Sequence, residues 1–92
     1  MRITIAHNNN EETLKVVAHL KKLLQKKNVV FDAKYPDVVI TVGGDGTLIN
    51  AFHRYINQVS SIRFIGVHTG HLGFYTDWRS YDVDKMVDAL FL

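Results

Sequence analysis

The chain contains no cysteine, which excludes disulfide bonds, thiolate metal sites and a cysteine nucleophile. No apolar run approaches the length of about 20 residues that a membrane-spanning helix requires. The N-terminal stretch Met1–Ala6 is too short and too alternating to be a signal peptide. These absences favour a cytoplasmic protein in a reducing compartment, with no membrane partner.

An excess of charge of one sign is also missing. The formal net charge is only +2, and the basic residues lie mostly on one predicted helix, where Lys15, Lys22 and Lys26 share the face away from its apolar stripe. This pattern is typical of a solvated helix face and lacks the basic patch that nucleic-acid binding requires. We therefore expect no nucleic-acid partner.

The chain is short, and its 92 residues make one small domain at most. A chain of this size buries only about 60–65% of its unfolded surface, so its stability alone would be marginal. The last three residues, Leu90-Phe91-Leu92, are apolar and lack a polar cap. We expect residues 1–92 to be the front portion of a longer protein.

Strand-like and helix-like segments alternate along the chain. Residues 2–7 alternate between apolar and polar, which predicts a strand, and the β-branched run Val38–Val42 predicts a strand buried on both faces. The other expected elements are a helix capped by Asn10 and stopping near Asn28, a short strand or buried link at 29–31, a helix at 48–56, a strand at 62–67, a turn at 77–81 and a helix at 82–92. This order implies a three-layer α/β sandwich with a mostly parallel sheet.

Two of the predicted helices carry apolar stripes with helical spacing. The first stripe consists of Val16, Val17, Leu20, Leu23 and Leu24, and the second of Leu48, Ile49, Phe52, Tyr55 and Ile56. We expect both stripes to be buried. The loops after the second and third long strands would then lie together at the carboxyl edge of the sheet, where open α/β sheets bind ligands.

The most informative segment is Gly43-Gly44-Asp45-Gly46-Thr47, which follows the buried strand directly. Three glycines leave the backbone almost bare, so a phosphate or a sugar can approach it closely. We expect Thr47 to cap the next helix, whose N-terminus favours anions. A carboxylate in such a loop suits a base for a hydroxyl group or a Mg²⁺ ligand, and the pattern favours phosphoryl transfer. The alternative is a turn aspartate that caps local amides.

A second glycine-rich segment, Gly70-His71-Leu72-Gly73-Phe74-Tyr75, extends to Asp77. Together with the glycine turn, it resembles the NAD kinase family over roughly residues 37–80. The turn alone is shared with diacylglycerol and sphingosine kinases, and in related form with phosphofructokinases. Lipid kinases usually carry a glutamate soon after the turn, where this chain has Leu48–Ala51. A lipid or sugar kinase, or a non-catalytic assembly module, remains the alternative.

The resemblance implies a phosphofructokinase/NAD kinase-like N-terminal domain and a specific reaction. Family members transfer phosphate from ATP, with Mg²⁺, or in some cases from polyphosphate, to the adenosine-ribose 2′-hydroxyl of NAD. In this sequence the resemblance implies a catalytic base at Asp45, a phosphate loop made by Gly43, Gly44, Gly46 and Thr47, and substrate contacts at Gly44, Asp45, Gly46, Ile49, Asn50, Phe74 and Tyr75. No metal-ligating protein residue is implied, and Asn50 departs from the cationic contact that some members have.

The resemblance also implies partners beyond NAD and ATP. The family's second, β-rich domain is absent from this chain, and intact members are homo-oligomers, so we expect a dimer or a tetramer and an inactive 92-residue piece. Among the remaining side chains, His68 and His71 indicate loop hydrogen bonding more than a metal site, because a third ligand is lacking. His53 is expected at the surface or in a subunit contact, and Trp78 at the edge of the sheet.

Overall fold

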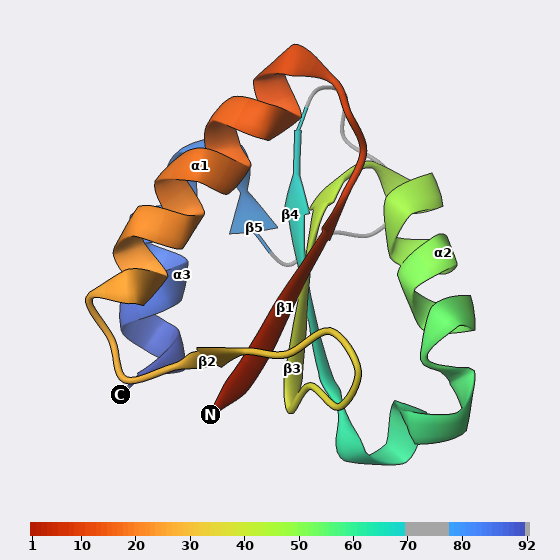
Figure 1. Cartoon of the computed structure of the whole chain (residues 1–92). Helices are drawn as coiled ribbons and strands as arrows, with labels where there is room; N and C mark the ends of the chain where they lie inside the picture. The colour runs from red at the N-terminus through yellow and green to blue at the C-terminus, as the bar shows by residue number, and fades with distance from the viewer. Residues whose placement is uncertain (70–77, 92) are drawn as a thin grey trace.

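The computed structural model describes residues 1–69 and 78–91. Its centre is a five-stranded sheet with the order β2-β1-β3-β4-β5, in which every neighbouring pair is parallel (Figure 1). The strands are β1 (Arg2–His7), β2 (Val30–Phe31), β3 (Val38–Gly43), β4 (Arg63–His68) and β5 (Trp78–Arg79). The predicted parallel α/β architecture is therefore confirmed.

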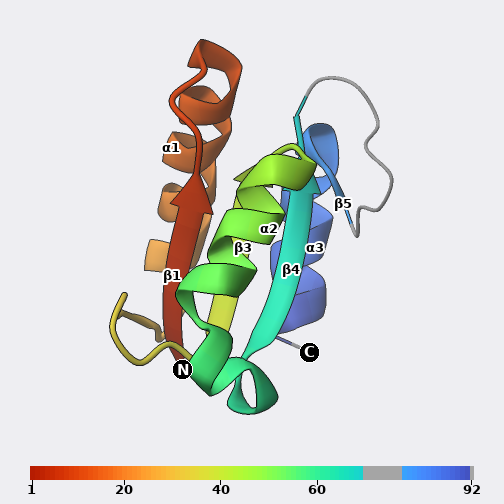
Figure 2. The ribbon, with the colours of Figure 1, turned by 90° about the vertical axis from the view of Figure 1, so that its right-hand side faces the viewer.

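Helices cover the sheet on both faces, as Figures 1 and 2 show. Helices α1 (Glu11–Gln25) and α3 (Val83–Leu90) lie side by side on one face, and α2 (Asp45–Arg54) lies on the other. Short 3-10 turns, η1 (Ile56–Ser61) and η2 (Ser80–Asp82), follow α2 and precede α3. Among the described helices none is long and apolar enough to cross a membrane.

Strand β3 organises both layers of the core, because each of its residues is buried. Its side chains alternate between faces, as in any strand. Val38, Ile40 and Val42 pack in the larger core with α1 and α3, whereas Val39 packs with α2 against Ala51. The predicted apolar stripe of α1 is confirmed, because its members are buried in this larger core or packed against it.

The predicted apolar stripe of the second helix is confirmed only in part, because Tyr55 is buried as expected but three of the other members are exposed. Ile49, Phe52 and Ile56 are 54%, 44% and 55% exposed, whereas Ala51 and Tyr55 face the sheet. Helix α2 also begins three residues earlier than predicted, at Asp45, because Gly44 occupies the N-cap position and Asp45 is favoured in the first turn by the helix dipole. The prediction that Thr47 caps this helix is therefore also wrong.

The C-terminal part differs from expectation in one further place. Residues 78–81 were expected in a turn, but Trp78 and Arg79 form β5, which pairs with Val67 and His68 at the open edge of β4. Trp78 packs against the larger core, in agreement with its expected place at the sheet edge. The last helix spans Val83–Leu90, slightly shorter than the predicted 82–92.

Gly43 ends β3 in a backbone conformation that disfavours side chains. Its φ is +152°, and a Cβ atom built there would lie 2.5 Å from Thr47 Oγ1 and 2.9 Å from Asn8 Nδ2. Gly44, by contrast, has a φ of −101°, and its Cβ would meet nothing within 4 Å. The fold itself therefore requires glycine at position 43 but not at position 44.

Gly43→Ala is expected to lower the free energy of unfolding by about 1–3 kcal/mol, because it adds backbone strain and a steric clash. Thermal unfolding monitored by circular dichroism measures the effect, with Gly44→Ala as the matched control. The control is expected to lose only about 0.5–1 kcal/mol, because alanine is a poorer N-cap than glycine but meets no clash at position 44. Equal losses in the two variants would contradict this assignment.

Candidate functional site

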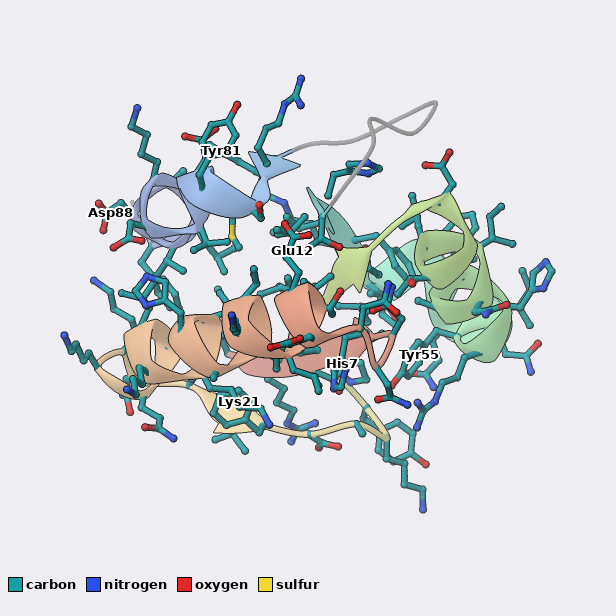
Figure 3. The ribbon with its side chains drawn as sticks, turned by 90° about the horizontal axis from the view of Figure 1, so that it is seen from above. His7, Glu12, Lys21, Tyr55, Tyr81 and Asp88 are labelled. Carbon is teal, nitrogen blue, oxygen red and sulfur yellow. The ribbon has the colours of Figure 1, made fainter. Side chains whose placement is uncertain are left out.

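The carboxyl edge of the sheet carries the candidate site, and Figure 3 looks down on this edge. From β1 the chain crosses through α1 to β2, and from β3 it crosses in the other direction through α2 to β4. The two connections run in opposite directions from β1 and β3, so the strand order reverses between these two strands. Doubly wound sheets bind ligands in the crevice at such a reversal. Asn8, after β1, and the glycine turn, after β3, are both at this point.

The glycine turn places Asp45 at the N-terminus of α2. The amides of Thr47 and Leu48 donate to the Gly44 carbonyl at 3.2 and 3.3 Å, so the helix starts immediately after the strand. Asp45 therefore stands at a fixed distance from a strand that is hydrogen-bonded on both sides. Helix N-termini attract phosphate through free amides and the dipole, so the turn can hold an anion beside this carboxylate.

The other two glycines of the turn, Gly44 and Gly46, leave open space. A Cβ atom at Gly44 or at Gly46 would meet nothing within 4 Å, and neither residue has a positive φ. Packing among the described residues thus gives no reason for glycine at these two positions. A ligand that lies against the backbone would give one, because it needs the volume that side chains would fill.

A small hollow lies on the β4 side of Asp45. It is lined by Gly43, Gly44, Asp45 and Leu48 from the turn and α2, and by Thr41, Gly66, Val67 and His68 from the paired strands. Gly66 and His68 lie opposite Thr41 and Gly43 in the β3–β4 register. His68 is buried, so an imidazole ring stands in the wall of the hollow that also contains the candidate base.

A larger hollow, of about 340 Å³, lies on the β1 side of the turn. It runs between β1 and α2 and is lined by Ile5, Ala6, His7, Asn8, Thr47, Asn50, Ala51 and Arg54. The polar side chains offer hydroxyl, amide, imidazole and guanidinium groups, all of which suit an anionic ligand. Figure 3 shows His7 in the space between α1 and α2.

Several of these lining residues were not predicted from the sequence. His7 ends the first strand and Asn8 follows it, and only the strand order shows that β1 pairs with β3 and brings them to the glycine turn. Arg54 lies at the far end of α2, and its guanidinium also stacks 5.6 Å from the Tyr55 ring centroid. The sequence does carry a signal for these residues. The carboxyl ends of parallel strands share one edge of the sheet, so the loop after the first strand belongs at the same edge as the two later loops.

The other predicted site residues have varied positions. Asn50 lines the larger hollow, and Ile49 is exposed on α2. His53 is exposed, in agreement with its expected place at the surface. The second glycine-rich segment, with His71, Phe74 and Tyr75, lies outside the described residues. Within residues 1–69 and 78–91 no three histidine or carboxylate side chains gather as a metal site would require.

The fold is a doubly wound α/β domain, with a carboxylate on a glycine turn at the reversal of strand order, where sheets of this class bind ligands. Residues 3–91 match the family described as the ATP-NAD kinase N-terminal domain. The chain belongs to this family, which confirms the resemblance drawn from the two glycine-rich segments.

Curated relatives agree with this assignment. The chain is 83% identical over 92 residues to the NAD kinase of Lactobacillus helveticus, 82% identical over 92 residues to that of Lactobacillus acidophilus, and 59% identical over 90 residues to that of Lactobacillus johnsonii. The matches to the first two cover 100% of this chain but 34% of each relative. The chain thus spans about a third of the length of these relatives.

A solved structure shares the fold. The crystal structure of yeast NADH kinase complexed with NADH superposes with a TM-score of 0.70 over 98% of this chain and 37% of that chain. The two sequences are only 14% identical over this match, so the likeness shows the fold alone.

Proposed function

We propose that the full-length protein is an NAD kinase that phosphorylates the adenosine-ribose 2′-hydroxyl of NAD with ATP, and that this chain is its N-terminal α/β nucleotide-binding domain. The observation that carries the proposal is Asp45 at the start of α2, on a glycine turn that packing alone does not explain. Membership of the family and the NAD kinase relatives support the same reaction.

Asp45 acts in this proposal as the general base. A ribose hydroxyl is a very weak acid, so the carboxylate aligns it and accepts its proton only as the new O–P bond forms. Such a base contributes about 10²–10⁴ in rate. The bond between the γ-phosphorus and the ADP oxygen breaks in the same step, and ADP leaves with the electron pair. The rigid end of β3 keeps the base in line with the attacking oxygen.

The two substrates lie on different sides of the glycine turn in this proposal. We assign the triphosphate to the larger hollow between β1 and α2, because Arg54, Asn8 and Asn50 supply cationic and amide donors there. The nucleoside of NAD then lies over Gly44, Gly46 and Ile49, where the surface is open, with Phe74 and Tyr75 of the second segment proposed beside the adenine.

Mg²⁺ enters with ATP in this proposal. The described residues provide oxygen donors in Asp45, Thr47 and the amide side chains but no protein cage, which fits an ion bound mainly by phosphates and water. When bound, the ion would supply positive charge that offsets the negative charge of the transferring phosphoryl group. His7 lies in the same hollow and adds donor capacity to the triphosphate site.

The remaining parts of the proposal concern the whole protein. We propose a second, β-rich domain that completes the NAD site, and a homo-oligomer, either a dimer or a tetramer. Three exposed apolar residues, Ile49 and Phe52 of α2 and Ile56 of η1, support an additional contact surface in the full-length assembly. A cytoplasmic location and the absence of nucleic-acid partners stay predictions from the sequence.

The direct test is the conversion of NAD to NADP by the purified full-length protein with MgATP, measured by a coupled NADP assay. A lipid or sugar kinase would instead phosphorylate diacylglycerol or a sugar and leave NAD unchanged. The isolated 92-residue chain serves as a control and should form no NADP, because half of the NAD site is missing. Robust turnover by that chain would contradict the proposed division of the site.

Asp45→Asn in the full-length protein should lower kcat by about 10²–10⁴, because the amide cannot accept the proton. Affinity for NAD should stay within about tenfold of wild type, since the turn is preserved and an asparagine is nearly isosteric. Single-turnover kinetics and calorimetric titration measure the two quantities. Asp88→Asn, on the remote exposed face of α3, is the matched control. Lost binding with residual turnover intact would assign Asp45 a structural role.

Gly46→Ala separates folding from function at the turn. Alanine is the better helix former and meets no neighbour, so the variant should be about 0.5–1 kcal/mol more stable than wild type. Its KM for NAD should nevertheless rise about 5- to 150-fold, because a methyl group would overpack a ligand that lies on the backbone. Thermal unfolding and steady-state kinetics check both halves. Unchanged kinetics would place NAD away from Gly46.

Arg54→Gln tests the larger hollow as the donor site. Loss of a charged donor to phosphate should raise the KM for MgATP about tenfold and leave the KM for NAD unchanged. Arg63→Gln removes an exposed arginine at the opposite edge of the sheet and is the matched control. A selective rise in the KM for NAD would reverse the assignment of the two sides.

A further inference from the structure

Thr13 is an unusual member of the buried face of α1. It is fully buried, and the other buried residues of that helix, Val17, Leu20 and Leu24, are apolar. A valine would fill the same volume without a polar atom that needs a partner. Packing alone therefore does not explain why this buried position carries a hydroxyl group.

The hydroxyl of Thr13 contacts a residue at the carboxyl edge of the sheet. Its Oγ1 lies 3.2 Å from Oγ1 of Thr69, 56 positions later in the chain. Thr69 follows β4 directly, and its amide donates to the carbonyl of Gly43 at 3.2 Å. This bond continues the β3–β4 ladder by one step beyond the pair of Gly43 and His68.

The three residues form a chain of contacts from α1 to the glycine turn. Thr13 holds the side chain of Thr69, the amide of Thr69 holds the carbonyl of Gly43, and Asp45 follows two residues after Gly43. Thr69 also immediately precedes Gly70, the first residue of the second glycine-rich segment. One buried hydroxyl is thus placed to fix the geometry where β3 and β4 end.

We propose that Thr13 is a positioning residue for phosphoryl transfer, which acts through Thr69 on the turn that presents Asp45. It does not touch the substrates in this assignment. Its hydroxyl holds Thr69 so that the Gly43 carbonyl, and with it the start of α2, keeps one orientation. A purely structural role would change stability, whereas a positioning role changes the chemical step. The kinetic part of this inference rests on the proposed NAD kinase activity.

The test compares Thr13→Val and Thr13→Ser in the full-length protein. Thr13→Val should lower kcat about tenfold and leave the KM values for NAD and MgATP within about twofold, because misplacement of the base affects the reacting geometry more than binding. Thr13→Ser keeps the hydroxyl and should restore kcat to within about twofold of wild type. Thr4→Val, at a threonine of β1 outside this chain of contacts, is the control.

A double-mutant cycle with Thr69→Val tests the path. If Thr13 acts through Thr69, the double variant should have about the same kcat as either single variant, whereas independent effects would multiply. Multiplying effects, or a loss of kcat in Thr13→Val that serine does not restore, would overturn the proposal.

Hydrogen exchange separates failure of this inference from failure of the proposed function. Loss of the Thr13 hydroxyl should speed exchange of the amides of Thr69, Thr47 and Leu48 about tenfold, whatever reaction the protein catalyses. If the wild-type protein forms no NADP but this exchange still responds to Thr13→Val and not to Thr13→Ser, the proposed function fails and the contact chain stands. Unchanged exchange in Thr13→Val would overturn the contact chain even in an active enzyme.

Discussion

The site depends on the parallel pairing of β3 with both of its neighbours up to the last residue before the glycine turn. β1 pairs with β3 from Ile3 to His7, and β4 pairs with it from Arg63 to His68. Helices cover both faces, so the strand is buried along its whole length. Two neighbouring strands and two helix layers restrict the motion of β3 up to its last residue. The carboxylate of Asp45, two residues beyond Gly43, is therefore also restricted in its position. A catalytic base gains most of its effect from such fixed geometry.

Helix α2 combines three tasks on three of its faces. Ala51 and Tyr55 close the smaller core against the sheet, while Thr47, Asn50 and Arg54 line the hollow toward β1. Its third face exposes Ile49 and Phe52, and Ile56 of the following turn η1 is exposed as well. Since core packing fixes the rotation of the helix, it also fixes which side chains reach the hollow. The packing that stabilises the smaller core therefore also places the proposed donor contacts in the hollow.

The sequence predicts some parts of this structure well, for physical reasons. Local pattern alone predicts β3 and the buried face of α1. The β-branched run Val38–Val42 indicates a buried strand, and the helical spacing of Val17, Leu20 and Leu24 indicates one apolar helix face. The glycine turn was identifiable because three glycines around a carboxylate have a chemical meaning without any tertiary context. The presence of these elements, and the place of Asp45 at the strand-to-helix junction, follow from the local sequence alone.

Other parts depend on interactions between distant segments. Apolar residues occupy so much of the circumference of α2 that periodicity alone cannot decide between Ile49 and Ala51 as the inward residue. The pairing of β1 with β3 sets the hollow that joins Asn8 to Arg54, and no local pattern encodes a strand order. The strand at Trp78 forms only because β4 offers an open edge. The contact between Thr13 and Thr69 likewise needs the assembled sheet.

The most direct measurement is a crystal structure of the full-length protein with NAD and a non-hydrolysable ATP analogue. We expect a carboxylate oxygen of Asp45 within hydrogen-bond distance, about 2.6–3.2 Å, of the adenosine-ribose 2′-oxygen. We also expect the γ-phosphate to lie in line with that oxygen on the β1 side of the turn. An Asp45 side chain turned away from the ribose and bonded to its own backbone amides, with NAD bound elsewhere, would contradict the account.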